Sequence, residues 1–149
     1  MTEIKIQKSA TPEQLLYADI LEKGMFFGLA LIIVTFVLYL TGIMSPAVPL
    51  DQIAGYWELP VKEYLAAINT NFLHLAHPPT GWVWMTLLGK SDFLNFLPIA
   101  ILGGVTIVCY VAIIPGLFKR GDKAYAIMAI AEVLILTLAA SGVLSAGGH

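Results

Sequence analysis

One ionisable residue interrupts a long apolar run near the C-terminus of this chain of 149 residues. Glu132 lies inside the run from residue 124 to residue 144, where an ionisable group costs at least about 2.5 to 3.5 kcal/mol to insert into a membrane. Helical rise places Tyr110 and Thr35, in two other apolar runs, at a similar depth. Two roles stay open for Glu132. It exchanges protons with a quinone or a relay shared with a partner, or it stays protonated and donates a hydrogen bond that holds helices together.

Two histidines, His74 and His77, stand three residues apart and share one face if a helix continues through them. Zinc sites use at least three protein ligands, and two imidazoles alone do not make one, so we expect no metal site. Contact with a lipid headgroup, a quinone or a partner subunit stays open, as does a plain interfacial helix. No apolar run contains a histidine, so we expect no haem b held by this chain alone.

The sequence lacks the short signatures of common catalytic sites. It has no phosphate-binding G-x-x-x-x-G-K-[ST], no G-x-G-x-x-G, no H-E-x-x-H and no serine nucleophile elbow. Its single cysteine excludes an internal disulfide and a set of thiolate ligands. A net charge of −2 without blocks of like charge offers nucleic acid no electrostatic footprint. We therefore expect a protein that is not an enzyme and has no cofactor of its own, and that at most shares a quinone or lipid with a partner subunit.

Composition identifies the elements that must position these residues. Hydrophobic residues make up 58% of the chain and charged residues only 12%, and the mean hydropathy is +0.83. Three runs are long enough to cross a lipid core as helices, at residues 24–44, 95–118 and 124–144. We therefore predict a single membrane domain of the all-α class with three transmembrane helices. The first run is longer than a signal peptide's core, so we expect it to be retained.

Basic residues set the expected orientation. The five-residue turn 119–123, KRGDK, holds three of them, and short loops of that kind stay on the cytoplasmic side. Further lysines lie in the N-terminal segment 1–23, which we expect inside. The loop 47–93 and the C-terminus are then outside, in the cytoplasmic (inner) membrane of a bacterium.

The N-terminal segment carries a helix-start signal, with Thr11 as N-cap, Pro12 at the first helical position and Glu13 and Gln14 in the first turn. Two interpretations remain: a short amphipathic helix at the inner interface, or an extension of the first membrane helix.

The loop 47–93 is too long and too apolar for a simple connector. Helical spacing of apolar residues begins after Pro60 and continues until Pro78 stops it just beyond His77. Aromatic residues then predict a belt at the headgroup level, formed by Tyr56, Trp57, Trp82 and Trp84. We expect one or two interfacial helices here, with His74, His77, Trp82 and Trp84 as docking candidates.

All three apolar runs contain small residues, which allow helices to approach one another closely in membranes. Examples are the G-x-x-x-G pair of Gly24 and Gly28, the pair of Gly103 and Gly104, and residues 139–142. Close packing of this kind favours partners beyond lipid, namely redox or permease subunits of the membrane or further copies of the chain.

Residues 117–136, LFKRGDKAYAIMAIAEVLIL, place a basic-Gly-Asp-basic-x-Tyr turn at the entry to the last run. With this turn and three apolar runs, the chain resembles the uncharacterised bacterial membrane family called domain of unknown function 1634. The resemblance implies a three-span accessory protein of unassigned activity, sometimes considered alongside anion permeases, and it carries over no catalytic residue. The long aromatic loop, its two histidines and Glu132 depart from the family's usual form.

These features together predict a non-catalytic subunit of a larger respiratory or electron-transfer complex, contributing to a quinone site or proton path. The alternative is membrane transport, as an accessory subunit or a small oligomeric channel or carrier. Glu132, Tyr110 and Thr35 are the candidate residues for the quinone site or proton path, and Glu132 is the residue expected to line a transport path.

Overall fold

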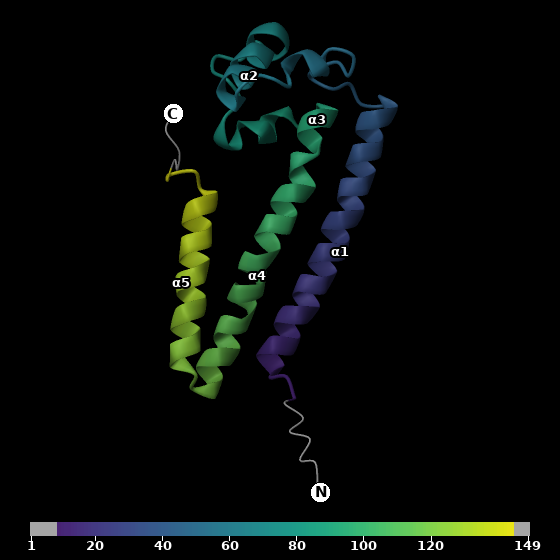
Figure 1. The fold of residues 1–149 in the computed structure, drawn as a ribbon. Helices are drawn as coiled ribbons and strands as arrows, with labels where there is room; N and C mark the ends of the chain where they lie inside the picture. Colours follow the sequence, from purple (N-terminus) through teal and green to yellow (C-terminus); the bar gives the residue numbers. More distant parts are fainter. Residues whose placement is uncertain (1–8, 145–149) are drawn as a thin grey trace, which may run out of the picture. The chain divides into compact units, whose positions relative to one another are not determined.

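The computed structural model of the protein describes residues 9–144, and every regular element in this range is helical (Figure 1). The three long helices are α1 (Pro12–Thr41), α4 (Phe96–Arg120) and α5 (Lys123–Ala140). All three are long and apolar enough to cross a membrane. The predicted all-helical class with three helices of spanning length is therefore confirmed for this part of the chain.

Glycines with positive φ angles end two of the long helices earlier than the apolar runs do. Helix α1 ends at Thr41 and is followed by Gly42 at φ +69°, although the apolar run continues to residue 44. Helix α5 ends at Ala140, and Gly142 at φ +74° lies inside the predicted span. A left-handed glycine directly after a helix is a common terminator, because the missing Cβ removes the steric penalty.

The start of α1 confirms Thr11 as the N-cap. The Gln14 backbone N–H donates to Thr11 Oγ1 at 3.3 Å, and the Thr11 N–H donates to Gln14 Oε1 at 2.9 Å. This reciprocal pair is a capping box. From Pro12 the helix runs without a break to Thr41, so the N-terminal stretch is an extension of the first apolar helix. The separate amphipathic helix is not formed.

The chain divides into two compact units. The first joins the residues up to 25, with the start of α1, to the residues from 104 onward, with most of α4 and all of α5. Its α4–α5 hairpin turns through Gly121 at φ +81°. The Gly121 N–H donates to the Phe118 carbonyl and the Asp122 N–H donates to the Leu117 carbonyl, both at 3.1 Å. This Schellman pattern satisfies the last carbonyls of α4 and allows α5 to begin two residues later.

The second unit, residues 26–103, contains the segment between the long helices, residues 45–95, which we call the cap. Its core is formed by Ala47, Val48, Ile68 and Phe93. The elements around this core are all short. Two are 3₁₀ helices, η1 (Ile53–Tyr56) and η3 (Gly81–Leu87), two are α-helices, α2 (Val61–Ile68) and α3 (Ser91–Leu94), and one is a π turn, η2 (Asn69–Leu73). The predicted long loop is thus a folded structure with its own apolar core.

A carboxylate fastens the two ends of the cap together. Asp92 accepts hydrogen bonds from the backbone N–H of Ala47 at 2.9 Å and of Val48 at 3.1 Å, and from the N–H of Phe93 at 3.1 Å. The Ser91 N–H adds a backbone bond to the Ser45 carbonyl at 3.3 Å. Residues that follow α1 are therefore held directly against residues that precede α4.

The predicted helix through both histidines is wrong. Helix α2 ends at Ile68, a single π turn follows to Leu73, and His74 adopts a left-handed conformation at φ +52°. Asn69 causes this ending, because its side-chain amide donates to the Leu75 carbonyl at 3.1 Å and accepts from the Leu75 N–H at 2.9 Å. The helix thus stops before Pro78 acts, and His74 and His77 share no helical face.

Close approach of helices at Gly24 and Gly28 is confirmed. A Cβ atom on Gly24 would lie 2.6 Å from Val105 Cγ2, and one on Gly28 would overlap the Leu102 side chain, both on α4. No atom lies within 4 Å of a Cβ built on Gly103 or Gly104. These two glycines therefore have open space beside them within the described chain.

The Gly24→Ala substitution should separate α1 from α4 at this point, because Val105 is β-branched and its side chain cannot rotate away from the added methyl group. We expect the free energy of unfolding to fall by about 1 to 3 kcal/mol. The readouts are thermal unfolding in detergent and the rate of maleimide labelling at Cys109, which is fully buried in the same unit. The matched control is Gly104→Ala, which should match the native protein in both. Equal labelling rates in both variants would contradict the tight seam.

Candidate functional site

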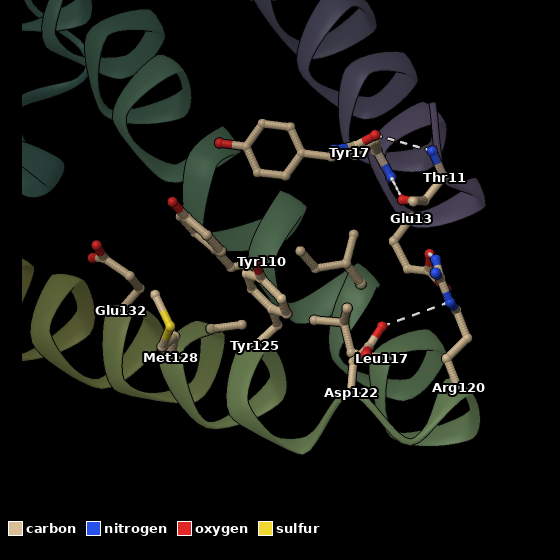
Figure 2. A pocket seen from close by; sticks show the side chains of 13 residues that line it. Thr11, Glu13, Tyr17, Tyr110, Leu117, Arg120, Asp122, Tyr125, Met128 and Glu132 are labelled. Carbon is tan, nitrogen blue, oxygen red and sulfur yellow. Dashed lines mark hydrogen bonds and ion pairs between the residues drawn. The ribbon is translucent and has the colours of Figure 1, made fainter. Parts of the chain in front are cut away.

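A cavity of about 700 Å³ lies in the first unit, between the start of α1, the end of α4 and the first half of α5 (Figure 2). Both polar and apolar side chains line it. They are Thr11, Glu13, Gln14, Tyr17, Tyr110, Ile113, Leu117, Arg120, Asp122, Tyr125, Met128, Ala129 and Glu132. A volume of this size is within the range of small-molecule sites in proteins.

Ion pairs gather at the end of the cavity beside the α4–α5 turn. Arg120 Nη1 donates to Glu13 Oε2 at 2.5 Å, and Arg120 Nε lies 3.7 Å from Asp122 Oδ2. The Glu13 side chain is only 10% exposed, because it lies against Gly116, where a Cβ would come within 3.1 Å of Glu13 Cγ. The start of α1 is thereby held to the end of α4 by charge and by close backbone approach.

Aromatic side chains form the middle of the cavity. The rings of Tyr17 and Tyr110 meet edge to face, with centroids 5.5 Å apart and planes at 72°. Beside them the Cys109 thiol, which has no exposed surface, donates a weak hydrogen bond to the Tyr17 carbonyl at 3.7 Å. Tyr125 of α5 lines the same cavity and is mostly exposed.

Glu132 lies on the α5 side of the cavity, beyond Met128. Figure 2 shows its carboxylate on the same side as the hydroxyls of Tyr17 and Tyr110. Within residues 9–144 no hydrogen bond or ion pair is formed by this carboxylate, whereas Glu13 and Asp122 both contact Arg120. Glu132 is thus the carboxylate of the cavity that has capacity for a ligand or a partner.

The structure brings together two of the three residues proposed for proton exchange. Tyr110 and Glu132 line one cavity. Thr35 belongs to the second unit, where its buried hydroxyl donates to the Ile32 carbonyl of its own helix at 3.1 Å. A threonine bonded to its own helix has its donor already satisfied.

The docking candidates all lie in the cap. His74 and His77 are exposed. The rings of Trp82 and Trp84 are 5.9 Å apart, and Trp84 also packs 6.1 Å from Phe96 at the start of α4. Trp84 therefore belongs partly to the cap core, whereas Trp82 is about half exposed. Within the described residues no group of three or more His, Cys, Asp or Glu is placed to hold a metal ion.

Of the residues that line the cavity, sequence reasoning named only Tyr110 and Glu132 as site candidates, and it missed Tyr17, Glu13 and Arg120 among others. A signal for Tyr17 exists, because it lies seven residues before Gly24 and so shares the helix face that packs closely. The Glu13–Arg120 pair joins residues 107 positions apart, and no local pattern announces such a contact.

The fold and the cavity define a small protein with three apolar helices of membrane-spanning length. The chain belongs to the family of an uncharacterized protein from Archaeoglobus fulgidus, which is 39% identical over 147 residues covering 99% of each chain. No family model matches the chain, and no solved structure matches it. The resemblance of residues 117–136 to domain of unknown function 1634 therefore stays a prediction.

Proposed function

We propose that this chain is a non-catalytic membrane subunit of a larger respiratory or electron-transfer complex. In this role the cavity forms one wall of a quinone site, and Glu132 exchanges protons with the ligand while Tyr110 hydrogen-bonds to it. The observation that carries the proposal is an unpaired carboxylate on an apolar helix, facing a cavity of about 700 Å³ that also holds the Tyr110 side chain. Ionisable groups at this position in spanning helices are functional candidates by default.

The walls of the cavity suit an aromatic ligand with polar ends. Tyr17, Tyr110 and Met128 offer ring faces and a thioether, and Glu132 offers a hydrogen-bond acceptor or donor, depending on its protonation. Most of the α5 surface is exposed in the single chain, with only Ala126 and Ala129 buried. Lipid or a partner subunit has to cover the remainder, which fits a site shared between subunits.

The orientation proposed with this function places the α4–α5 turn and the Glu13–Arg120 pair on the cytoplasmic side and the cap outside. It is supported by the basic residues Lys119, Arg120 and Lys123 around that turn. Because the relative is archaeal, the location is proposed simply as the cytoplasmic membrane. The exposed residues of the cap, among them His74, His77 and Trp82, would then face a partner on the outer side.

Membrane transport is the second candidate function. Ionisable side chains line one cavity from Arg120 and Asp122 to Glu132, an arrangement that also suits an ion path. One chain with three such helices is small for an alternating-access carrier, so this role needs further copies or a permease subunit.

The two functions are separated by purifying the tagged full-length protein from its native membranes in mild detergent. Mass spectrometry and an absorption spectrum are recorded on the same sample. We expect redox subunits to co-purify, with haem or flavin absorption. A colourless homo-oligomer, or a complex with a permease, would contradict the redox function and place transport first.

A further inference from the structure

We infer that a groove on the cap binds a protein segment that inserts an apolar side chain flanked by lysine or arginine residues. This inference names the chemistry of the partner contact, and it rests on the proposed function only for the existence of a partner. The groove has a volume of about 290 Å³ and is formed by η1, the first turn of α2 and the residues between them. Its lining is Ile53, Tyr56, Trp57, Leu59, Val61 and Tyr64.

The floor of the groove is rigid. Tyr56 packs edge to face against Tyr64 at 6.3 Å and against Phe72 at 6.1 Å, and its hydroxyl accepts a hydrogen bond from Asn71 Nδ2 at 3.2 Å. Ile53, Tyr56 and Tyr64 all pack on the cap core. Burial, together with the nearby Asp92 carboxylate, raises the pKa of the Tyr64 hydroxyl, so this residue stays neutral. The floor is therefore preformed and uncharged.

The rim is apolar but exposed. Trp57 is 74% exposed and Val61 is 75% exposed, and Leu59 between them is also exposed. Large exposed aromatic and aliphatic side chains around a preformed hollow are typical of anchor sites at interfaces.

The charges next to the rim identify the occupant. Glu58 and Glu63 are adjacent in sequence to lining residues, and Asp51 lies two positions before Ile53. The one base in this stretch is Lys62, and all four charged residues are exposed. None of them forms a salt bridge within the part of the chain that the structure describes. Three carboxylates against one lysine attract a basic segment and repel the anionic headgroups that membrane-surface sites usually bind. A basic protein segment is therefore favoured over a lipid surface.

The test uses the full-length protein in its native membranes, with a photo-crosslinking phenylalanine analogue at Val61, and at Met85 of η3, an exposed residue outside the groove, as the control position. We expect the adduct at Val61 to be a protein segment that contains lysine or arginine beside the labelled site, formed several-fold more than at Met85. The double substitution Glu58→Gln and Glu63→Gln should lower the yield several-fold and remove its dependence on salt. Lys62→Gln should raise the yield, because it removes the one opposing charge.

Four results would overturn the inference. They are an adduct with lipid, no adduct above the Met85 control, an adduct with a segment that has no basic residue, or a crosslinking yield that is the same with and without the two glutamate substitutions. The redox proposal is judged separately by the purified complex. A basic segment of a permease crosslinked at Val61 would uphold the groove while the redox function fails. If redox subunits co-purify but no glutamate-dependent adduct forms at Val61, the redox function holds and the groove inference fails.

Discussion

Replacing Asp92 with alanine should open the cap while the long helices stay folded. The substitution leaves the N–H groups of Ala47 and Val48 without their acceptor, in a core where both residues are buried. Hydrogen bonds to a charged group contribute about 1.5 to 3 kcal/mol each, and a buried unpaired donor is costly, so we expect a loss of about 3 to 5 kcal/mol in cap stability. The measurement is amide hydrogen exchange, in which the amides of Ala47 and Val48 should exchange far faster.

Asp51→Ala is the control for this variant. It removes a carboxylate from the exposed surface of the same cap. Surface substitutions of this kind usually change the free energy of unfolding by less than about 0.5 kcal/mol. Asp92→Asn retains one acceptor oxygen and should fall between the two. If the Asp92→Ala variant exchanges its cap amides at the native rate, the carboxylate does not hold the cap together.

Glu132→Gln should abolish most proton-coupled turnover without unfolding the protein. Glutamine retains the volume and one hydrogen-bonding oxygen but removes the proton that the carboxyl exchanges. Positioned acid–base groups contribute about 10²- to 10⁴-fold to rate, so quinol oxidation by the purified complex should fall about a hundredfold. Tyr110→Phe removes only a hydroxyl from the opposite wall and should give a smaller fall.

The same substitution at Glu22, an exposed residue of α1, is the matched control and should leave turnover unchanged. A different pattern would assign Glu132 to packing: native turnover in Glu132→Gln, with a lowered unfolding temperature. Under the transport function, the same variant should lose flux instead of quinol oxidation. Native flux together with native turnover would end the proton-exchange role altogether.

The long helices were predictable because their cause is local. An uncharged run of sufficient length has few alternatives to a helix in lipid, where all backbone groups must be paired internally. Thr11 could be predicted as the N-cap for a similarly local reason, because the helix-start signal lies in the residues directly after it. Helix ends were less accurate, because Gly42 and Gly142 act through backbone conformation while apolar residues continue past them.

The cap and the cavity were less predictable because their causes are distant in the sequence. Asp92 acts on residues 44 and 45 positions away, and Asn69 ends a helix whose apolar spacing continues beyond it. Glu132 could be singled out from composition alone, and Tyr110 from its depth. Thr35 was singled out by the same depth argument, and it lies in the second unit, where its hydroxyl bonds to its own helix.

The short helix α5 has a consequence for the bilayer around the protein. Its 18 residues rise about 27 Å, against about 45 Å for the 30 residues of α1. In a hydrocarbon core about 30 Å thick, α5 has no length left for tilt, whereas α1 exceeds the thickness by several turns. A mismatch between helix length and hydrocarbon thickness costs a fraction of a kcal/mol for each ångström. We therefore expect the hydrocarbon core to be thinner than average around α5.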